Sequence, residues 1–173
     1  MTFQRTAIVA FALAAAASAV PASADAAPDI RVGPHGGFSF DAERAFIGVD
    51  AWFGIADITD NISLHLSPVF SYYFMPDNTT LWQLEFNVPF LFAIPNFDVL
   101  QPYAAAGLAL RHFSFNVDSA FIDVDVSDTD LGLNLIGGAM FIPEGSVNPF
   151  VQLRVNIGGE SDAAIMGGVR FNF

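Results

Sequence analysis

Hydrophobic and polar residues alternate along most of the chain, in runs separated by Asp, Asn, Gly or Pro. Successive side chains of a β-strand point to opposite faces, so such runs predict strands, and the separating residues are typical of turns. Eight runs carry this pattern. They span Ile30–Phe38, Ala45–Ile55, Ile62–Phe74, Thr80–Ile94, Gln101–Phe115, Thr129–Ile142, Asn148–Gly158 and Ala163–Phe173. The pattern predicts an all-β chain of eight antiparallel strands.

The division into two faces is clearest in the fourth run. One face carries Trp82, Leu84, Phe86, Val88, Phe90 and Phe92, and the other carries Gln83, Glu85, Asn87 and Pro89. A soluble sheet shows the same alternation with its apolar face inward. However, the chain contains no lysine, the residue that normally keeps the outer face of a soluble barrel dispersed. We therefore predict an up-and-down transmembrane β-barrel with a lipid-facing apolar exterior and a narrow, filled interior.

The composition agrees with a barrel that crosses a membrane through its strands. Hydrophobic residues make up 53% of the chain, yet the sequence after the N-terminal segment has no apolar run long enough for a spanning helix. A barrel strand places its apolar residues at every second position, which resolves this conflict. The absence of cysteine excludes a small disulfide-stapled scaffold.

The first residues predict secretion. Arg5 is followed by an apolar stretch from Ala7 to Val20 and then by Ala22-Ser23-Ala24, which is the pattern of a signal peptide with its cleavage site. We expect residues 1–24 to be removed and residues 25–173, roughly 150 in number, to form one barrel domain. A formal net charge of −12 argues against a nucleic-acid partner.

Charged and polar residues on the polar faces predict an interior network. The members are Arg31, His35, Asp50, His65, Glu85, Arg111, Arg154 and Arg170, with Gln83, Asn87, Asn134 and Gln152 as hydrogen-bonding partners. Interior charges cost several kcal/mol unless they are paired and hydrogen-bonded. The network is either a structural plug or a proton or ion path. Because eight strands enclose a lumen that side chains fill, the plug is the preferred interpretation.

Two surface clusters are weaker candidates for chemistry. Asp123, Asp125, Asp128 and Asp130 are carboxylates of the kind that bind calcium, although their spacing does not match an EF-hand. A solvated hairpin is the preferred interpretation, so we predict no metal site. His112 and Ser114 lie two apart on one face of the fifth strand, as a base and a nucleophile would, with Asp118, Asp123 and Asp125 following.

Three segments together carry a family resemblance: residues 101–108 (QPYAAAGL), residues 58–62 (ITDNI) and residues 169–173 (VRFNF). They resemble the OmpA-like and OmpX-like small outer-membrane barrels. The resemblance implies that Phe171 and Phe173 form the signal read by the barrel-assembly machinery. It also implies a periplasmic N-terminus, short periplasmic turns and longer outer connections. These would be Ser39 to Arg44, Met75 to Thr79, Asn116 to Asp128 and Gly159 to Asp162.

The resulting hypothesis is a monomeric, non-enzymatic protein of the bacterial outer membrane with no cofactor. Its partners would be membrane lipid, lipopolysaccharide and the assembly machinery. Its function would be a structural role in the envelope or surface interaction through the outer loops. The enzymatic alternative is lipid A or phospholipid hydrolysis at His112 and Ser114, a pair that resembles the lipid A deacylase family in part, since Phe115 follows the serine where that family has asparagine. Two further alternatives are a narrow solute pore and a secreted, soluble lipid-binding barrel.

Overall fold

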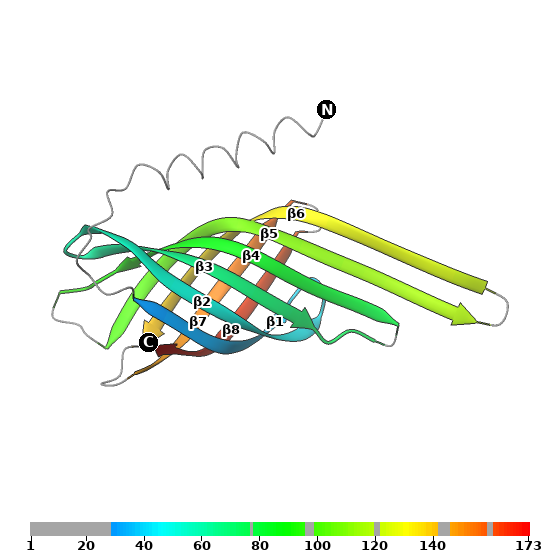
Figure 1. Cartoon of the computed structure of the whole chain (residues 1–173), viewed down its shortest axis with the longest axis horizontal. Helices are drawn as coiled ribbons and strands as arrows, with labels where there is room; N and C mark the ends of the chain where they lie inside the picture. Colours follow the sequence, from blue (N-terminus) through cyan, green and yellow to red (C-terminus); the bar gives the residue numbers. More distant parts are fainter. Residues whose placement is uncertain (1–28, 77, 96–98, 120–121, 142–145, 159–160) are drawn as a thin grey trace, which may run out of the picture.

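A computed structural model describes residues 29–76, 78–95, 99–119, 122–141, 146–158 and 161–173, with only the backbone described at 116–119 and 122–125. Eight strands close into an antiparallel barrel in chain order, as predicted (Figure 1). They are β1 (Ile30–Ser39), β2 (Arg44–Thr59), β3 (Ile62–Tyr73), β4 (Thr79–Phe92), β5 (Leu100–Ser119), β6 (Ile122–Phe141), β7 (Val147–Ile157) and β8 (Asp162–Asn172). Pairing of β1 with β8 closes the barrel, so the sheet has no free edge around its wall.

The two ends of the barrel differ. We call the end at which β1 begins and β8 ends the terminal end, and the opposite one the hairpin end, because β5 and β6 run far beyond the other strands there (Figure 1). The predicted signal peptide, residues 1–24, lies outside the described residues. Within the described residues, no helix has the length and apolarity needed to cross a membrane.

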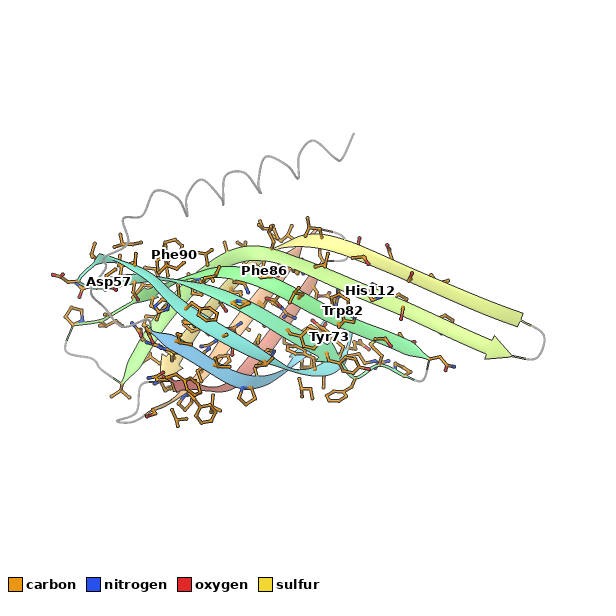
Figure 2. The ribbon with its side chains drawn as sticks, in the orientation of Figure 1. Asp57, Tyr73, Trp82, Phe86, Phe90 and His112 are labelled. Atoms are coloured by element: carbon orange, nitrogen blue, oxygen red, sulfur yellow. The ribbon has the colours of Figure 1, made fainter. Side chains whose placement is uncertain are left out.

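Burial along β4 decides which face points inward. Gln83, Glu85 and Asn87 are buried, whereas Phe86 is 51% and Phe90 is 38% exposed on the outer surface. Figure 2 shows apolar side chains projecting from the outside of the barrel wall. The apolar face is therefore the exterior and the polar face the lumen, which is the arrangement of a membrane barrel and the reverse of a soluble one.

The lumen is not purely polar, since two apolar clusters lie within it. One contains Trp52, Leu91, Tyr103, Ala105, Ile136, Met140 and Phe150. The other contains Phe46, Tyr73, Leu81, Ala164 and Met166. Large side chains from β2 to β8 thus pack inside the barrel, as expected for eight strands.

The predicted outer connection from Asn116 to Asp128 is wrong. β5 continues to Ser119 and β6 begins at Ile122, and the two pair residue by residue through this segment. The aspartates suggested a turn, but Ile122, Val124 and Val126 alternate with polar residues and favour a strand. β2 is also longer than predicted, because it reaches Thr59 through two register shifts.

The predicted connection from Gly159 to Asp162 is one residue too long, since β8 begins at Asp162. Residue 77 of the connection Met75 to Thr79, residues 159–160 and Ile142 lie outside the described residues. The other predicted strand ends agree with the structure to within two residues.

Gly107 of β5 is closely approached by atoms of β4, so a larger residue at this position tests the packing of the barrel. A methyl group there would lie 2.3 Å from the side-chain oxygen of Asn87 and 2.3 Å from the carbonyl oxygen of Phe86, whereas one at Gly137 of β6 would meet nothing within 4 Å. We expect Gly107→Ala to lower the free energy of unfolding by about 1–3 kcal/mol and Gly137→Ala to cause no loss. Urea unfolding in lipid vesicles measures both. Equal midpoints for the two variants would contradict this packing.

Candidate functional site

Glu85 is the centre of a hydrogen-bond network in the middle of the lumen. The carboxylate of this buried residue accepts hydrogen bonds from Gln83 Nε2 (3.0 Å), Asn87 Nδ2 (2.9 Å) and Asn134 Nδ2 (2.6 Å). Arg154 Nη1 donates a fourth bond to it and forms an ion pair. A buried charge is tolerated only when it is paired and its lone pairs are used, and Glu85 meets both conditions.

Arg154 is held equally firmly on its other side. Its Nη2 donates to the hydroxyl of Tyr73 at 2.6 Å, and that hydroxyl donates to Gln83 Oε1 at 3.2 Å. The guanidinium carbon also lies 5.2 Å from the centroid of the Phe46 ring, within the range of a cation–π contact. β2, β3, β4, β6 and β7 are thereby tied together across the lumen.

A second ion pair lies in the half of the lumen nearer the terminal end. Arg170 Nε donates to a carboxylate oxygen of Asp50 at 2.7 Å, and Nη2 forms an ion pair with the same oxygen at 2.6 Å. Its guanidinium carbon lies 3.9 Å from the Trp52 ring centroid and 3.6 Å from that of Phe150. The planar cation is thus in contact with two aromatic rings and joined to a carboxylate, a combination that suits arginine better than lysine.

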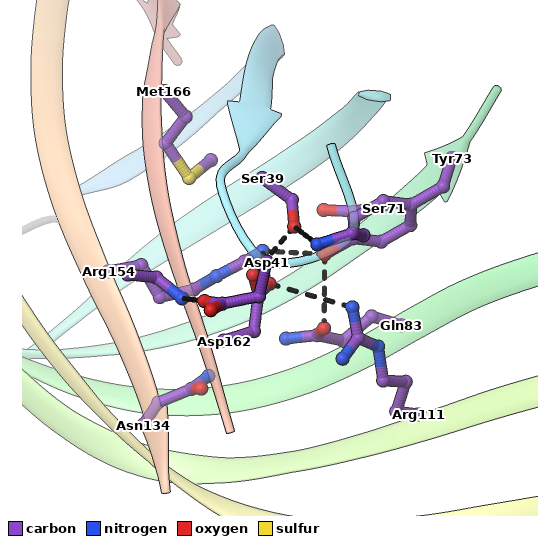
Figure 3. A network of polar contacts seen from close by, with 12 residues as sticks. Ser39, Asp41, Ser71, Tyr73, Gln83, Arg111, Asn134, Arg154, Asp162 and Met166 are labelled. Atoms are coloured by element: carbon purple, nitrogen blue, oxygen red, sulfur yellow. Dashed lines mark hydrogen bonds and ion pairs between the residues drawn. The ribbon is translucent and has the colours of Figure 1, made fainter. Parts of the chain in front are cut away.

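The remaining two arginines of the predicted network lie toward the two ends of the barrel. Arg31 pairs with Asp29 at 2.6 Å at the terminal end and is partly exposed. Arg111 lies 3.6 Å from Asp162, which also accepts a 2.6 Å hydrogen bond from Ser39 Oγ. Figure 3 shows Asp162 between Arg111 and Arg154, the latter at 3.9 Å.

The two predicted histidines lie in the lumen but not in the ion-pair chain. The ring of His35 is bonded through Nε2 to Ser71 Oγ at 3.1 Å, and that of His65 through Nε2 to Ser63 Oγ at 3.2 Å. Both are buried. Each ring is hydrogen-bonded to a neutral hydroxyl group of β3 and not to the other histidine. This geometry indicates a structural role for both.

The lumen is electrically balanced and closely filled. Each of its four arginines has a carboxylate partner, in the pairs Arg31–Asp29, Arg111–Asp162, Arg154–Glu85 and Arg170–Asp50. A cavity beside Asp50 and Trp52 has a volume of only about 10 Å³, which is close to the minimum for one water molecule. This geometry favours a plug over an open solute path.

An open space lies at the hairpin end. This space, which we call the vestibule, has a volume of about 450 Å³. Its lining residues are Asp41, Ala42, Met75, Leu81, Arg111, Phe113, Asp128, Asp130 and Ser161. Arg111 belongs both to the polar network (Figure 3) and to the lining of the vestibule, so the network borders this space on the lumen side.

The predicted acidic cluster is described only in part. Asp128 and Asp130 line the vestibule, whereas the side chains of Asp123 and Asp125 lie outside the described residues. Among the side chains that the structure describes, no three His, Cys, Asp or Glu residues are grouped as a metal site requires.

His112 and Ser114 lie on the outer wall of β5, but the structure gives His112 a different partner. Its Nδ1 is 2.9 Å from Thr129 Oγ1, and its ring lies 5.1 Å from that of Trp82 (Figure 2). Among the described side chains no hydrogen bond joins His112 to Ser114, and Asp118 lies outside them. A nucleophile requires contact with its base, and the described geometry does not supply it.

Solved structures with the same architecture are known. The N-terminal β-barrel domain of Pseudomonas aeruginosa OprF is 20% identical to the chain, with a TM-score of 0.65 over 84% of this chain and 97% of that one. The chain has the fold of the small outer-membrane β-barrels. Ail, the attachment invasion locus protein of Yersinia pestis, matches with 12% identity and a TM-score of 0.65 over 84% and 97%. Neisserial surface protein A matches with 15% identity and a TM-score of 0.55 over 84% and 96%. No protein-family model and no curated protein matches the sequence.

Two acidic members of the lumen network were missed by sequence reasoning. Asp162 was placed in a connection and Asp29 before the first strand. Asp162 shares its parity along the strand with Arg170, so extending the eighth run by one residue would have found it. The lumen aromatics also went unnoticed, although Trp52 has the same parity as Asp50.

The Glu85–Arg154 pair can be tested by neutralising one partner. We expect Glu85→Gln to lower the free energy of unfolding by about 3–5 kcal/mol, because it leaves Arg154 buried without a counter-charge. Asp57→Asn, at an exposed acid of β2, serves as the matched control and should change it little. The double variant with Arg154→Gln should recover part of the loss. Unfolding in vesicles that shows Glu85→Gln as stable as Asp57→Asn would refute the role of this pair.

The outer wall of β5 generates a second prediction. Because His112 contacts Thr129 and Trp82, we expect expression of the protein to leave the mass of lipid A unchanged, and Ser114→Ala to have no effect on it. Mass spectrometry of extracted lipid A is the measurement. A loss of acyl chains that Ser114→Ala abolishes would establish the hydrolase instead.

Proposed function

We propose that the protein is a non-enzymatic integral protein of the bacterial outer membrane whose barrel holds the β5–β6 hairpin outside the cell, where the hairpin makes contacts with other surfaces. The outward apolar belt supports residence in a membrane. The fold shared with outer-membrane barrels supports the outer membrane as its location. The hairpin end is then the outer end.

The observation that carries this proposal is the length of the hairpin. β5 and β6 pair from Leu100 and Phe141 to Ser119 and Ile122. Pairing of β5 with β4 ends at Phe115, and pairing of β6 with β7 ends at Leu133. The hairpin therefore stands clear of the barrel rim, as Figure 1 shows. A filled barrel does not need this extension to span the membrane, since about 9 to 11 residues per strand suffice.

The free part of β6 offers a backbone edge for recognition. Residues 122–132 pair with β5 on one side, and the pairing with β7 on the other side covers only residues 133–140. An unpaired strand edge presents N–H and C=O groups that can add an extended segment of another protein.

The negative charge of the hairpin limits the kind of partner it can bind. Five aspartates and no cationic residue lie between Asn116 and Asp130. Pairing of two copies through this edge would bring like charges together, which opposes self-association. Ail has been solved in complex with a heparin analogue, but an acidic hairpin disfavours such a polyanion here. We infer that the hairpin meets cationic protein segments.

A shortened hairpin separates a surface role from a purely envelope-structural one. Residues 116–125 are replaced by Asn-Gly, which joins the register partners Phe115 and Val126. We expect this variant to fractionate with the outer membrane and to show the gel shift between unheated and boiled samples. Cells of a deletion strain that express it should regain detergent resistance to the level given by the native protein but should adhere less to host-cell surfaces.

Two outcomes count against the proposal. Full adhesion by the shortened variant would remove the hairpin from the function and favour the envelope-structural role. A soluble native protein with no gel shift would remove the membrane barrel altogether and favour the secreted lipid-binding alternative.

A further inference from the structure

The vestibule has the size and the mixed lining of a small-molecule site. Its volume of about 450 Å³ lies within the range of about 300–1,000 Å³ typical of ligand cavities. The lining comes from the β1–β2 turn, from Met75 after β3, from β4, β5 and β6, and from Ser161 before β8. Residues distant in sequence therefore build one concave surface at the rim of the barrel.

Arg111 supplies a cation with unused hydrogen-bond donors to this surface. It is only 9% exposed, its Nε is buried without a hydrogen-bond partner among the described residues, and its guanidinium carbon lies 5.5 Å from the centroid of the Tyr73 ring. Its partner Asp162 lies at 3.6 Å, beyond hydrogen-bond distance, and also has Arg154 at 3.9 Å. A buried guanidinium N–H without a hydrogen-bond partner costs free energy. A carboxylate that enters the vestibule can accept from it.

The opposite charge comes from Asp41, Asp128 and Asp130. The lumen arginines are already matched by other carboxylates, and Arg44, which donates to the Glu43 carbonyl, does not line the vestibule. Asp41 and Asp128 each use one oxygen to accept a backbone N–H, from Ala163 at 2.7 Å and from Thr129 at 2.8 Å. Three carboxylates and one guanidinium line the vestibule, so negative charge is in excess there and attracts an ammonium group.

An apolar wall completes the surface. Met75, Leu81 and Phe113 line the vestibule between the charged groups. We propose that the vestibule binds a small zwitterion with an apolar body, of the class of the free hydrophobic α-amino acids. The carboxylate accepts hydrogen bonds from Arg111, the ammonium group faces the aspartates, and the apolar body packs on the wall. This site shares Asp128 and Asp130 with the base of the hairpin but does not depend on the contacts proposed for the hairpin.

Three probes that each carry a phenyl ring test which charged groups the vestibule recognises. Phenylalanine carries both groups, phenethylamine only the cation and 3-phenylpropionate only the anion. Equilibrium dialysis against the full barrel in lipid nanodiscs, with empty nanodiscs as the blank, should show phenylalanine binding about tenfold or more tightly than either single-charge probe. Phenethylamine binding as tightly as phenylalanine, or no binding by any probe, would overturn the proposal. Neither result would affect the conclusion drawn from the shortened hairpin.

Variants then test which side chain binds each charged group of phenylalanine. Arg111→Gln should lower the affinity for phenylalanine to that for phenethylamine, and Asp128→Asn combined with Asp130→Asn should lower it to that for 3-phenylpropionate. Arg44→Gln removes an arginine from the same end that does not line the vestibule and should bind all three probes as the native protein does. The gel shift verifies folding of each variant. An unchanged phenylalanine affinity in folded Arg111→Gln protein contradicts the assignment.

Discussion

Charge neutralisation inside a closed, water-poor lumen is the constraint on which the rest of the barrel depends. Eight strands leave room for side chains but hardly for solvent, so each interior arginine requires a carboxylate nearby. The Glu85–Arg154 pair meets this need at the centre, with Gln83, Asn87 and Asn134 completing the coordination of the carboxylate. Because these residues come from several strands, the pairing that neutralises charge also fixes how the strands are placed around the axis.

The same balance explains why the two ends of the barrel differ in character. Inside, cations and carboxylates match, and aromatic rings such as Trp52 and Phe150 enclose Arg170. At the hairpin end the match fails, since Asp128 and Asp130 continue β6 above the filled lumen, where solvent can hydrate them. The proposed function rests on this difference between a neutral, closed interior and an acidic, open rim. The barrel wall provides stability in lipid, and the rim and hairpin are left available for contacts.

The sequence predicted much of the fold because a membrane strand has a strict period of two. Parity placed Glu85, Arg154 and Arg170 on the polar faces, the absence of lysine indicated that these faces point inward, and the structure has them in the lumen. Asp162 was missed because an acidic residue at the end of the segment Gly158-Gly159-Glu160-Ser161 has the composition of a turn. The free hairpin was missed for the same reason, as its aspartates outweighed the alternation of Ile122, Val124 and Val126. Composition signals are weakest where a strand leaves the membrane, since water removes the need for an apolar face.

The number of strands and the division of each into two faces were therefore determined by the sequence through local alternation, and its composition indicated that the arginines point inward. Only the closed barrel decided which charges meet. Glu85 and Arg154 are 69 residues apart, and Asp50 and Arg170 are 120 apart. Their contact depends on strand register and on the stagger with which β1 joins β8, both of which are properties of the whole sheet. The vestibule follows from the same closure, because its lining is gathered from turns and strand ends that no local pattern connects.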